Sequence, residues 1–335
     1  MPPIVQAILL LIVGFVLLVK GADWFVDGAA GVAEKVRIPQ LVIGLTVVAF
    51  GTSAPELAVS LSSAMSSGGI ALGNVVGSNI TNILLILGLS AVFTALPVGS
   101  SLRKIDFPVL LGVSALFVLF AWTGETLESW EGILMAVILV AYTVFLILHS
   151  LSQKKRGLLE DEPEEAEDDG EKKGFGAWYE KMKGYTWFLI VILIVGLAMV
   201  VGGGVLAANN AEIIATELGV DERVIGLTVV AIGTSLPELV TSVTASIKGK
   251  TDIAVGNIVG SNIFNILMVA GLSSAILPIG GASAFLVDGV IALAAAGLLA
   301  LLGYLKGNKI TRIGGIVLLA GFVAYYVYLF VTTFA

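Results

Sequence analysis

Two short stretches place a carboxylate, a proline and hydroxyl side chains together inside long apolar runs. They are Gly51-Thr52-Ser53-Ala54-Pro55-Glu56 and Gly233-Thr234-Ser235-Leu236-Pro237-Glu238. Because proline has no backbone N–H, the carbonyl four residues before it loses its helical partner. The hydroxyl side chains three and four residues before each glutamate share a helix face with it. Carboxylate, hydroxyl and carbonyl oxygens are the ligands that hard cations prefer, so each stretch predicts part of a cation site.

A polar stripe follows each stretch in the sequence. Its members are spaced four residues apart, which places them on one face of a helix. They are Asn74, Ser78 and Asn82 in the first half and Asn257, Ser261 and Asn265 in the second. We therefore expect a second oxygen-bearing surface beside each glutamate.

The two glutamates limit which ion could bind. If Glu56 and Glu238 converge to about 4 Å at an effective dielectric near 20, their repulsion is roughly 4 kcal/mol. Without a cation, at least one is then expected to hold a proton, and protons should compete with the ion. One Ca²⁺, or two or more Na⁺, would neutralise both charges. The chain has no cysteine and one histidine, His149, which excludes a thiolate or multi-histidine site for zinc, copper or iron.

Composition predicts a polytopic membrane protein. Of 335 residues, 57% are hydrophobic and only 13% are charged. Ten apolar windows are long enough to span a bilayer, and we interpret the first as a retained helix rather than a cleaved signal. They lie near 4–22, 40–65, 70–95, 106–123, 130–149, 185–207, 223–247, 252–277, 284–303 and 312–333.

The basic residues predict the orientation of the chain. All of the 18 lysines and arginines except Arg223 fall in alternate loops, which places both termini outside the cell membrane. The sequence divides into a first five-helix repeat (1–149), an acidic cytoplasmic linker (150–184) and a second five-helix repeat (185–335). The run of acidic residues from Glu160 to Glu171 lacks the spacing of an EF-hand loop and predicts a solvated, disordered linker.

The two halves are copies of one another. Shifted by 182 residues, Ile43–Leu57 matches Ile225–Leu239 at all but two positions, and after one insertion Ala71–Ser90 matches Ala254–Ser273 at 14 of 20. With five helices in each half, the second copy must enter the membrane from the opposite side. The expected fold is all-α, with ten transmembrane helices arranged as two inverted five-helix repeats around a midplane site.

The paired motifs Gly-Thr-Ser-x-Pro-Glu and Gly-Asn-x-x-Gly-Ser-Asn-Ile-x-Asn resemble the α-repeats of the cation/calcium exchanger superfamily. The prokaryotic calcium/sodium antiporters related to sodium/calcium exchangers are the most similar group. The resemblance implies that Glu56 and Glu238 are the main Ca²⁺ ligands and share in binding Na⁺. It further implies carbonyl, hydroxyl and amide ligands from Ala49, Thr52, Ser53, Ala231, Thr234, Ser235, Ser78, Ser261, Asn82 and Asn265. It also implies that the first and sixth helices slide against the rest of the bundle.

One position narrows what the resemblance implies. Some relatives, notably those that depend on potassium, carry an aspartate where this chain has Asn265. Both Asn82 and Asn265 are neutral, which argues against potassium dependence. Whether the driving ion is Na⁺ or H⁺ stays open at this point.

These observations predict a secondary active antiporter that exchanges Ca²⁺ for Na⁺ by alternating access. A Ca²⁺/H⁺ antiporter or a broader cation exchanger is the alternative within transport. A passive channel would need a continuous hydrophilic path or a selectivity filter, and an intramembrane enzyme would need an asymmetrically placed nucleophile or base; the sequence offers neither. We expect no cofactor besides the transported ions, no nucleic-acid partner and no obligate protein partner, with the lipid bilayer as the surroundings.

Overall fold

The computed structural model describes residues 3–64, 68–155, 175–218, 231–305 and 307–334, and nearly all of them are helical. The helices of the first half are α1 (Pro3–Val36), α2 (Gln40–Ile43), η1 (Gly44–Val48), α3 (Ala49–Thr52), α4 (Ala54–Ala64), α5 (Gly68–Ile80), η2 (Thr81–Leu87), α6 (Gly88–Phe93), η3 (Leu102–Asp106), α7 (Phe107–Thr123) and α8 (Ser129–Lys155). Those that follow are α9 (Phe175–Lys183), α10 (Thr186–Glu217), α12 (Ala231–Thr234), α13 (Leu236–Ile247), α14 (Thr251–Phe264), η5 (Asn265–Ala270), α15 (Gly271–Ile276), η6 (Ala282–Phe285), α16 (Leu286–Tyr304) and α17 (Arg312–Phe334).

The helices have the length and composition of a multi-pass membrane protein. Among the described residues, eight helices are long and apolar enough to cross a bilayer. The bent pair Gln40–Thr52 and Ala54–Leu61, which meet at 41°, makes a ninth candidate. The predicted window 223–247 begins within 219–230, and most of the predicted linker is 156–174; both stretches lie outside the described residues. The count of ten helices therefore stays a prediction.

The first helix is longer than its apolar window. The window near 4–22 ends at the charged residues that follow Lys20, but α1 continues to Val36. Its carboxylates at Asp23 and Asp27 lie within the helix, and both are paired with Lys248. In the same way α10 continues to Glu217, ten residues beyond the predicted window. Hydropathy marks the part of a helix that lies in lipid and does not mark its ends.

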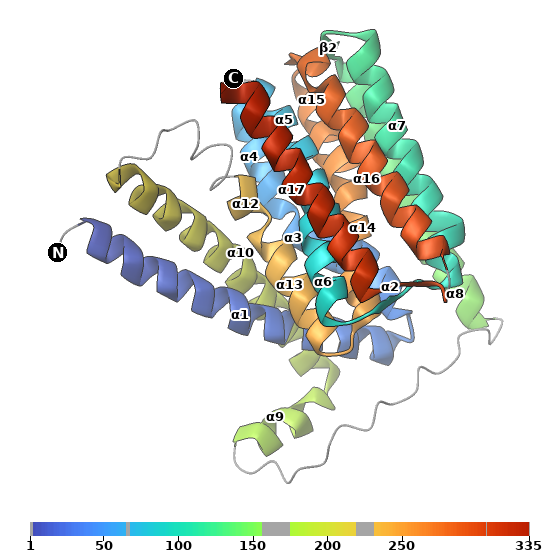
Figure 1. Ribbon diagram of the computed structural model, residues 1–335. Helices are drawn as coiled ribbons and strands as arrows, with labels where there is room; N and C mark the ends of the chain where they lie inside the picture. The colour runs from blue at the N-terminus through green and yellow to red at the C-terminus, as the bar shows by residue number, and fades with distance from the viewer. Residues whose placement is uncertain (1–2, 65–67, 156–174, 219–230, 306, 335) are drawn as a thin grey trace.

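Helices α1 and α10 form a tightly joined pair (Figure 1). A Cβ on Gly14 would lie 2.9 Å from the carbonyl oxygen of Gly203, and one on Gly21 would lie 2.9 Å from that of Gly196. Only glycine permits backbones to approach this closely. Gly14 lies against Gly203, whereas Gly28, further along α1, lies against Leu193, which is earlier in α10. The two helices are therefore antiparallel. Gly196 and Gly203 are also the repeat equivalents of Gly14 and Gly21.

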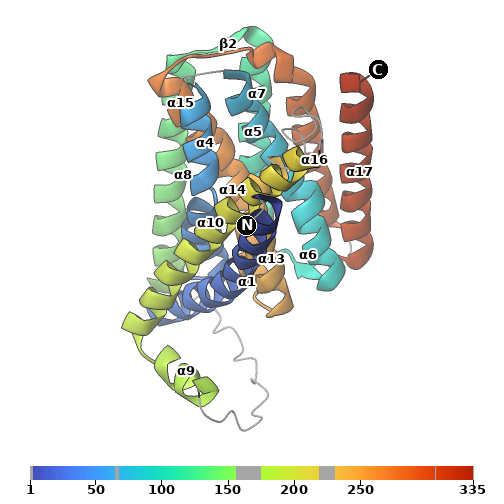
Figure 2. The ribbon, with the colours of Figure 1, turned by 90° about the vertical axis from the view of Figure 1, so that its left-hand side faces the viewer.

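The rest of the molecule surrounds α14. Every side chain from Ile253 to Ala270 is buried. The largest core cluster lies around it, with contributions from α5, α7, α8 and α16. In contrast, α1 and α10 contact this bundle through smaller, separate clusters. Figure 2 shows the pair crossing the bundle obliquely, while α8 and α17 stand at opposite edges. The α1–α10 pair is thus a unit that lies against the bundle rather than within it.

Two short antiparallel ladders, which the all-helical prediction did not include, join the two halves. One pairs β1 (Leu96–Pro97) with β4 (Lys309–Ile310), and the other pairs β2 (Thr126–Leu127) with β3 (Ile279–Gly280). A shift of 183 residues carries β1 onto β3 and β2 onto β4. Each ladder therefore joins a loop of one half to a loop of the other. In both ladders the charge pattern assigns the two joined loops to the same side of the membrane.

Candidate cation site

Both glutamate stretches break their helices in the same way. Helix α3 ends and α4 begins around Ser53, whose φ is −84° and ψ is 5°; α12 and α13 are separated by Ser235, with φ −88° and ψ 5°. The proline in each motif follows directly, at the second position of the new helix, where a missing N–H costs nothing. The break places Glu56 and Glu238 in the first turn of α4 and α13, where the helix dipole favours negative charge.

The carboxylates of Glu56 and Glu238 are fully buried and close enough to repel each other. Both Glu56 and Glu238 are 0% exposed, and each is a neighbouring charge of the other. Ser53 donates a hydrogen bond to Glu238 Oε1 at 3.1 Å, and Ser261 donates to the same atom at 3.4 Å. Glu238 Oε2 and both carboxylate oxygens of Glu56 have no protein partner. Ser53 of the first half therefore donates a hydrogen bond to the carboxylate of the second half, so the two stretches meet.

The threonines are held by asparagines from the opposite half. Thr52 Oγ1 lies 3.0 Å from Asn257 Oδ1, and Asn257 Nδ2 donates to Ser242 at 2.8 Å. The equivalent chain runs from Thr234 to Asn74 Oδ1 at 3.2 Å. Asn74 Nδ2 donates to Ser60 at 3.3 Å. These two hydrogen-bond chains are related by the repeat shift.

The far ends of the polar stripes are buried and lie in irregular helical segments. Asn82 and Asn265 are both 0% exposed, and neither amide oxygen nor nitrogen of either has a protein partner. They lie in η2 and η5, which are π-helical segments, a feature that is frequent at functional sites. Helix α4 packs on η5 and α13 packs on η2, so each π-helical segment lies against the glutamate helix of the other half. Ser235 Oγ lies 3.4 Å from Ser78 Oγ.

Buried polar atoms without a hydrogen-bond partner are rare in folded proteins, so each needs a physical explanation. Among the described residues, seven of the sixteen such side-chain atoms are on the two glutamates and the two π-helical asparagines. Within the described residues no three His, Cys, Asp or Glu side chains are grouped to hold a metal ion. A cation in this cluster would be bound by two carboxylates and neutral oxygens. That donor set fits hard ions such as Ca²⁺ and Na⁺.

The predicted backbone ligands are placed at the two breaks. Ala49 is buried, and its carbonyl accepts the N–H of Ser53 at 3.0 Å and the hydroxyl of Thr52 at 3.4 Å. Ala231 is the first residue of α12, the helix that ends at Thr234. Each predicted side-chain ligand thus lies on a broken helix or on the polar stripe beside it.

Sequence reasoning placed Asn74 and Asn257 on the polar stripe but left them out of the site. Their role depends on hydrogen bonds across 160 and 205 residues of chain. Spacing within one helix cannot reveal such a partner. The π-helical geometry of η2 and η5 likewise has no signal in the motif, because it arises from how these segments pack.

A family model described as sodium/calcium exchanger protein matches residues 6–148 and 188–331. The chain belongs to this family. Its members are exchangers, which are transporters rather than enzymes. The matched residues include both broken helices and both polar stripes, so they cover the whole cluster described above.

Individual exchangers are similar over their full length. A putative antiporter, CaxA, from Alkalimonas amylolytica is 39% identical over 97% of this chain and 98% of its own. The sodium/calcium exchanger MaX1 from Methanosarcina acetivorans is 35% identical over 96% and 98%. A solved structure of the sodium-calcium exchanger NCX_Mj superposes with a TM-score of 0.81 at 30% identity, covering 97% of this chain and 99% of that one. The chain is thus a prokaryotic-type cation/calcium exchanger.

The asparagine chains give a testable expectation for this exchanger. Replacing Asn257 by alanine removes one hydrogen-bond partner each from Thr52 and Ser242, and Asn74→Ala removes one each from Thr234 and Ser60. Losing the one buried hydrogen bond to the threonine costs about 1 kcal/mol, so apparent Ca²⁺ affinity should fall about fivefold. Because the two chains are related by the repeat, we expect the two variants to weaken Ca²⁺ binding by similar factors. Titration calorimetry measures both; a large loss in only one variant would contradict an equal role.

Proposed function

We propose that the chain is a secondary active antiporter that exchanges Ca²⁺ for Na⁺ at a single site formed by both halves. One observation carries the proposal: two fully buried glutamates from two equivalent helix breaks lie in one cluster, with unpartnered carboxylate and amide oxygens around them. Glu56 and Glu238 are the charged ligands. Thr52, Ser53, Ser78 and Asn82, with their equivalents in the second half and the carbonyls of Ala49 and Ala231, supply neutral oxygens.

Alternating access follows from the proposed inverted repeat. The proposal is supported by the antiparallel α1–α10 pair, by the two ladders that link opposite halves and by the two asparagine chains. Each of these contacts has a counterpart in which the equivalent residues of the two halves change places. Two halves that can adopt each other's conformation would expose the same site first to one side and then to the other. The α1–α10 pair, which packs as a separate unit, is the part we propose to move.

Charge balance accounts for why an ion must be bound before the site changes the side of the membrane to which it is open. Two buried carboxylates carry two negative charges, and an ion in a low-dielectric interior is costly unless it is compensated. One Ca²⁺ or at least two Na⁺ removes that charge. The names of MaX1 and NCX_Mj as sodium/calcium exchangers support Na⁺ as the driving ion. Exchange for H⁺ is the alternative, since a protonated carboxyl is also neutral.

We place the protein in the cell membrane with both termini outside and the linker 150–184 in the cytoplasm. The supporting observation is the distribution of lysine and arginine between alternate loops. In this orientation the β1–β4 ladder is cytoplasmic, and the exposed side chains of Lys104, Lys309 and Arg312 lie at that end.

Transport in liposomes tests the driving ion. We expect purified protein to accumulate Ca²⁺ when the liposomes are loaded with Na⁺ and diluted into Na⁺-free medium. A proton gradient directed out of the liposomes, with an acidic interior, no Na⁺ and the same concentration ratio as the Na⁺ gradient, is expected to drive little Ca²⁺ uptake. Uptake that ignored the Na⁺ gradient and followed the pH gradient would establish the alternative and reject Na⁺ coupling. Liposomes without protein are the control for leakage.

A further inference from the structure

The two ends of the α1–α10 pair are packed differently against the bundle. At the end assigned to the cytoplasm, Phe25, Val26 and Ala29 of α1 form a fully buried cluster with Val48 and Ala245 of the bundle. At the same end, a Cβ on Gly51 would lie 2.8 Å from the side chain of Leu197 on α10. No space remains between the pair and the broken helix here.

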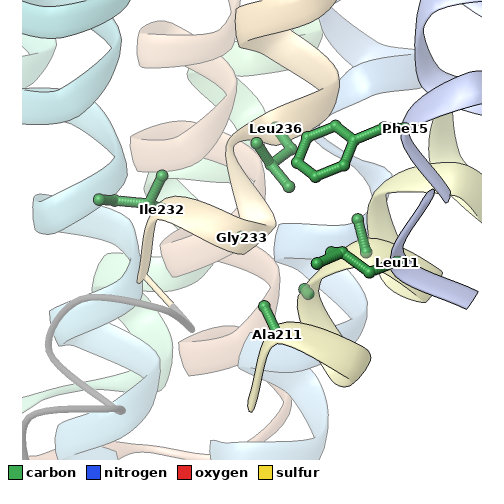
Figure 3. Close-up of a pocket in the computed structure, with 8 residues that line it drawn as sticks. Leu11, Phe15, Ala211, Ile232, Gly233 and Leu236 are labelled. Carbon is green, nitrogen blue, oxygen red and sulfur yellow. The ribbon is translucent and has the colours of Figure 1, made fainter. Parts of the chain in front are cut away.

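At the other end, a Cβ on Gly233 would lie 2.7 Å from Ala208 of α10, but the equivalent of the Gly51–Leu197 contact is not made. Phe15 is the repeat equivalent of Leu197, and Gly233 is the equivalent of Gly51. Between them lies an apolar cavity of about 230 Å³, lined by Leu11, Ala208 and Leu236 among others (Figure 3). Within the described residues, the cavity lies at this end alone, which favours a conformation that is closed at the cytoplasmic end.

A cluster of charges lies at the closed end. Lys248, which follows α13, places its Nζ 2.7 Å from Asp27 Oδ1 and 2.9 Å from Asp23 Oδ1 on α1. Tyr179 of α9 donates to Asp27 Oδ2 at 3.3 Å, and Lys183 lies 3.8 Å from the same atom. Burial and the neighbouring Asp27 carboxylate raise the pKa of Tyr179, so it remains a hydrogen-bond donor at physiological pH. Asp27 thus connects α1 to α9 and to the helix that carries Glu238.

The repeat has no equivalent of this cluster. The residues at the positions of Asp23 and Asp27 in the second half are Val205 and Asn209. The position of Lys248 corresponds to Met65 or Ser66 in the first half. Two halves of identical sequence would make the two access states equally stable by symmetry, so a bias between them must come from residues in which the halves differ. This charge cluster is such a difference, and it bridges the moving pair and the bundle.

We propose that Asp27 and Lys248 form an ionic latch that stabilises the conformation closed at the cytoplasmic end. The inference rests on the proposed alternating-access function, which supplies the second conformation. Opening the cytoplasmic end requires α1 to move relative to α13, and that movement separates Asp27 from Lys248. Single exposed ion pairs contribute little, but here one carboxylate is shared by a lysine, a tyrosine and a second lysine in a partly buried position.

Cysteine accessibility tests the latch, because the chain has no native cysteine. Ala245→Cys reports on the cytoplasmic cluster, where the side chain is 0% exposed, and Ala208→Cys reports on the cavity at the other end. Each reporter is combined with Asp27→Asn, with Lys248→Gln or with Lys250→Gln in nanodiscs. Lys250→Gln is the matched control, since it removes the same charge from the same loop and Lys250 makes no ion pair within the described part of the chain.

We expect Asp27→Asn and Lys248→Gln to increase maleimide labelling of the Ala245→Cys reporter about threefold to tenfold and to decrease labelling of the Ala208→Cys reporter. Lys250→Gln should change neither. Raising KCl from about 10 to 500 mM should reproduce the effect in the reporter proteins that retain Asp27 and Lys248, because salt screens ion pairs. Unchanged labelling in both latch variants, or increased labelling at both ends, would overturn the latch. Labelling is read without transport, so absence of Ca²⁺ exchange in the unmodified protein would instead reject the proposed function.

Discussion

Either Glu56→Gln or Glu238→Gln is expected to reduce Na⁺-driven Ca²⁺ uptake at least a hundredfold. Each change preserves the size of the side chain and removes one of the two charges that we propose to bind the ion. At about 4 Å and an effective dielectric near 20, a unit charge pair is worth about 4 kcal/mol. The interaction with a divalent ion is larger, and about 2.7 kcal/mol already corresponds to a hundredfold in binding. Initial rates in liposomes with matched protein content measure the effect.

A buried carboxylate outside the site provides the control for this prediction. Asp106 is 0% exposed and accepts a hydrogen bond from Tyr142 at 2.8 Å, away from both broken helices. Asp106→Asn keeps that acceptor and should leave exchange within about twofold of the unmodified protein. If Asp106→Asn were as damaging as the glutamine variants, loss of transport would report disturbed folding rather than loss of a ligand. Normal transport in either glutamine variant would remove that residue from the site.

Adjacent glycines on α10 are expected to respond in opposite directions to the same substitution. A Cβ on Gly203 would lie 2.8 Å from the carbonyl oxygen of Gly14 and 2.8 Å from the backbone nitrogen of Leu18. Neither atom can move without separating α1 from α10. A Cβ on Gly202 meets nothing within 4 Å. Gly203→Ala should therefore lower the melting temperature by several degrees, with loss of transport, because a forced separation in a packed seam costs about 1–3 kcal/mol.

Gly202→Ala should leave the melting temperature unchanged or raise it slightly, since alanine favours a helix over glycine by up to about 1 kcal/mol. Thermal unfolding followed by intrinsic fluorescence in one detergent compares the two variants directly. Equal destabilisation by both would mean that the α1–α10 seam is not as close as the backbone contacts require. A stable Gly203→Ala protein that had lost transport would show that the seam limits movement rather than folding.

The sequence predicts the features that depend on a short motif and that occur in both halves of the chain. Pro55 and Pro237 mark both helix breaks, and the duplicated motif identifies Glu56 and Glu238 as buried without any contact information. Other features depend on partners that are distant in the chain. The carboxylate of Asp27, which lies beyond the apolar window of α1, is paired with Lys248, 221 residues away. The ladders arise where two loops meet, and two residues of extended backbone carry no pattern of their own. Local sequence thus predicts which groups enter the site, and the packing of one half on the other determines how they are held.

The count of bound ions tests the shared site most directly. In titration calorimetry without Na⁺, we expect one Ca²⁺ to bind per chain and Na⁺ to displace it with a steep, cooperative dependence on concentration. Either Glu56→Gln or Glu238→Gln should remove this single binding event as a whole. Two Ca²⁺ per chain, with each glutamine variant retaining one of them, would contradict a site made by both halves together.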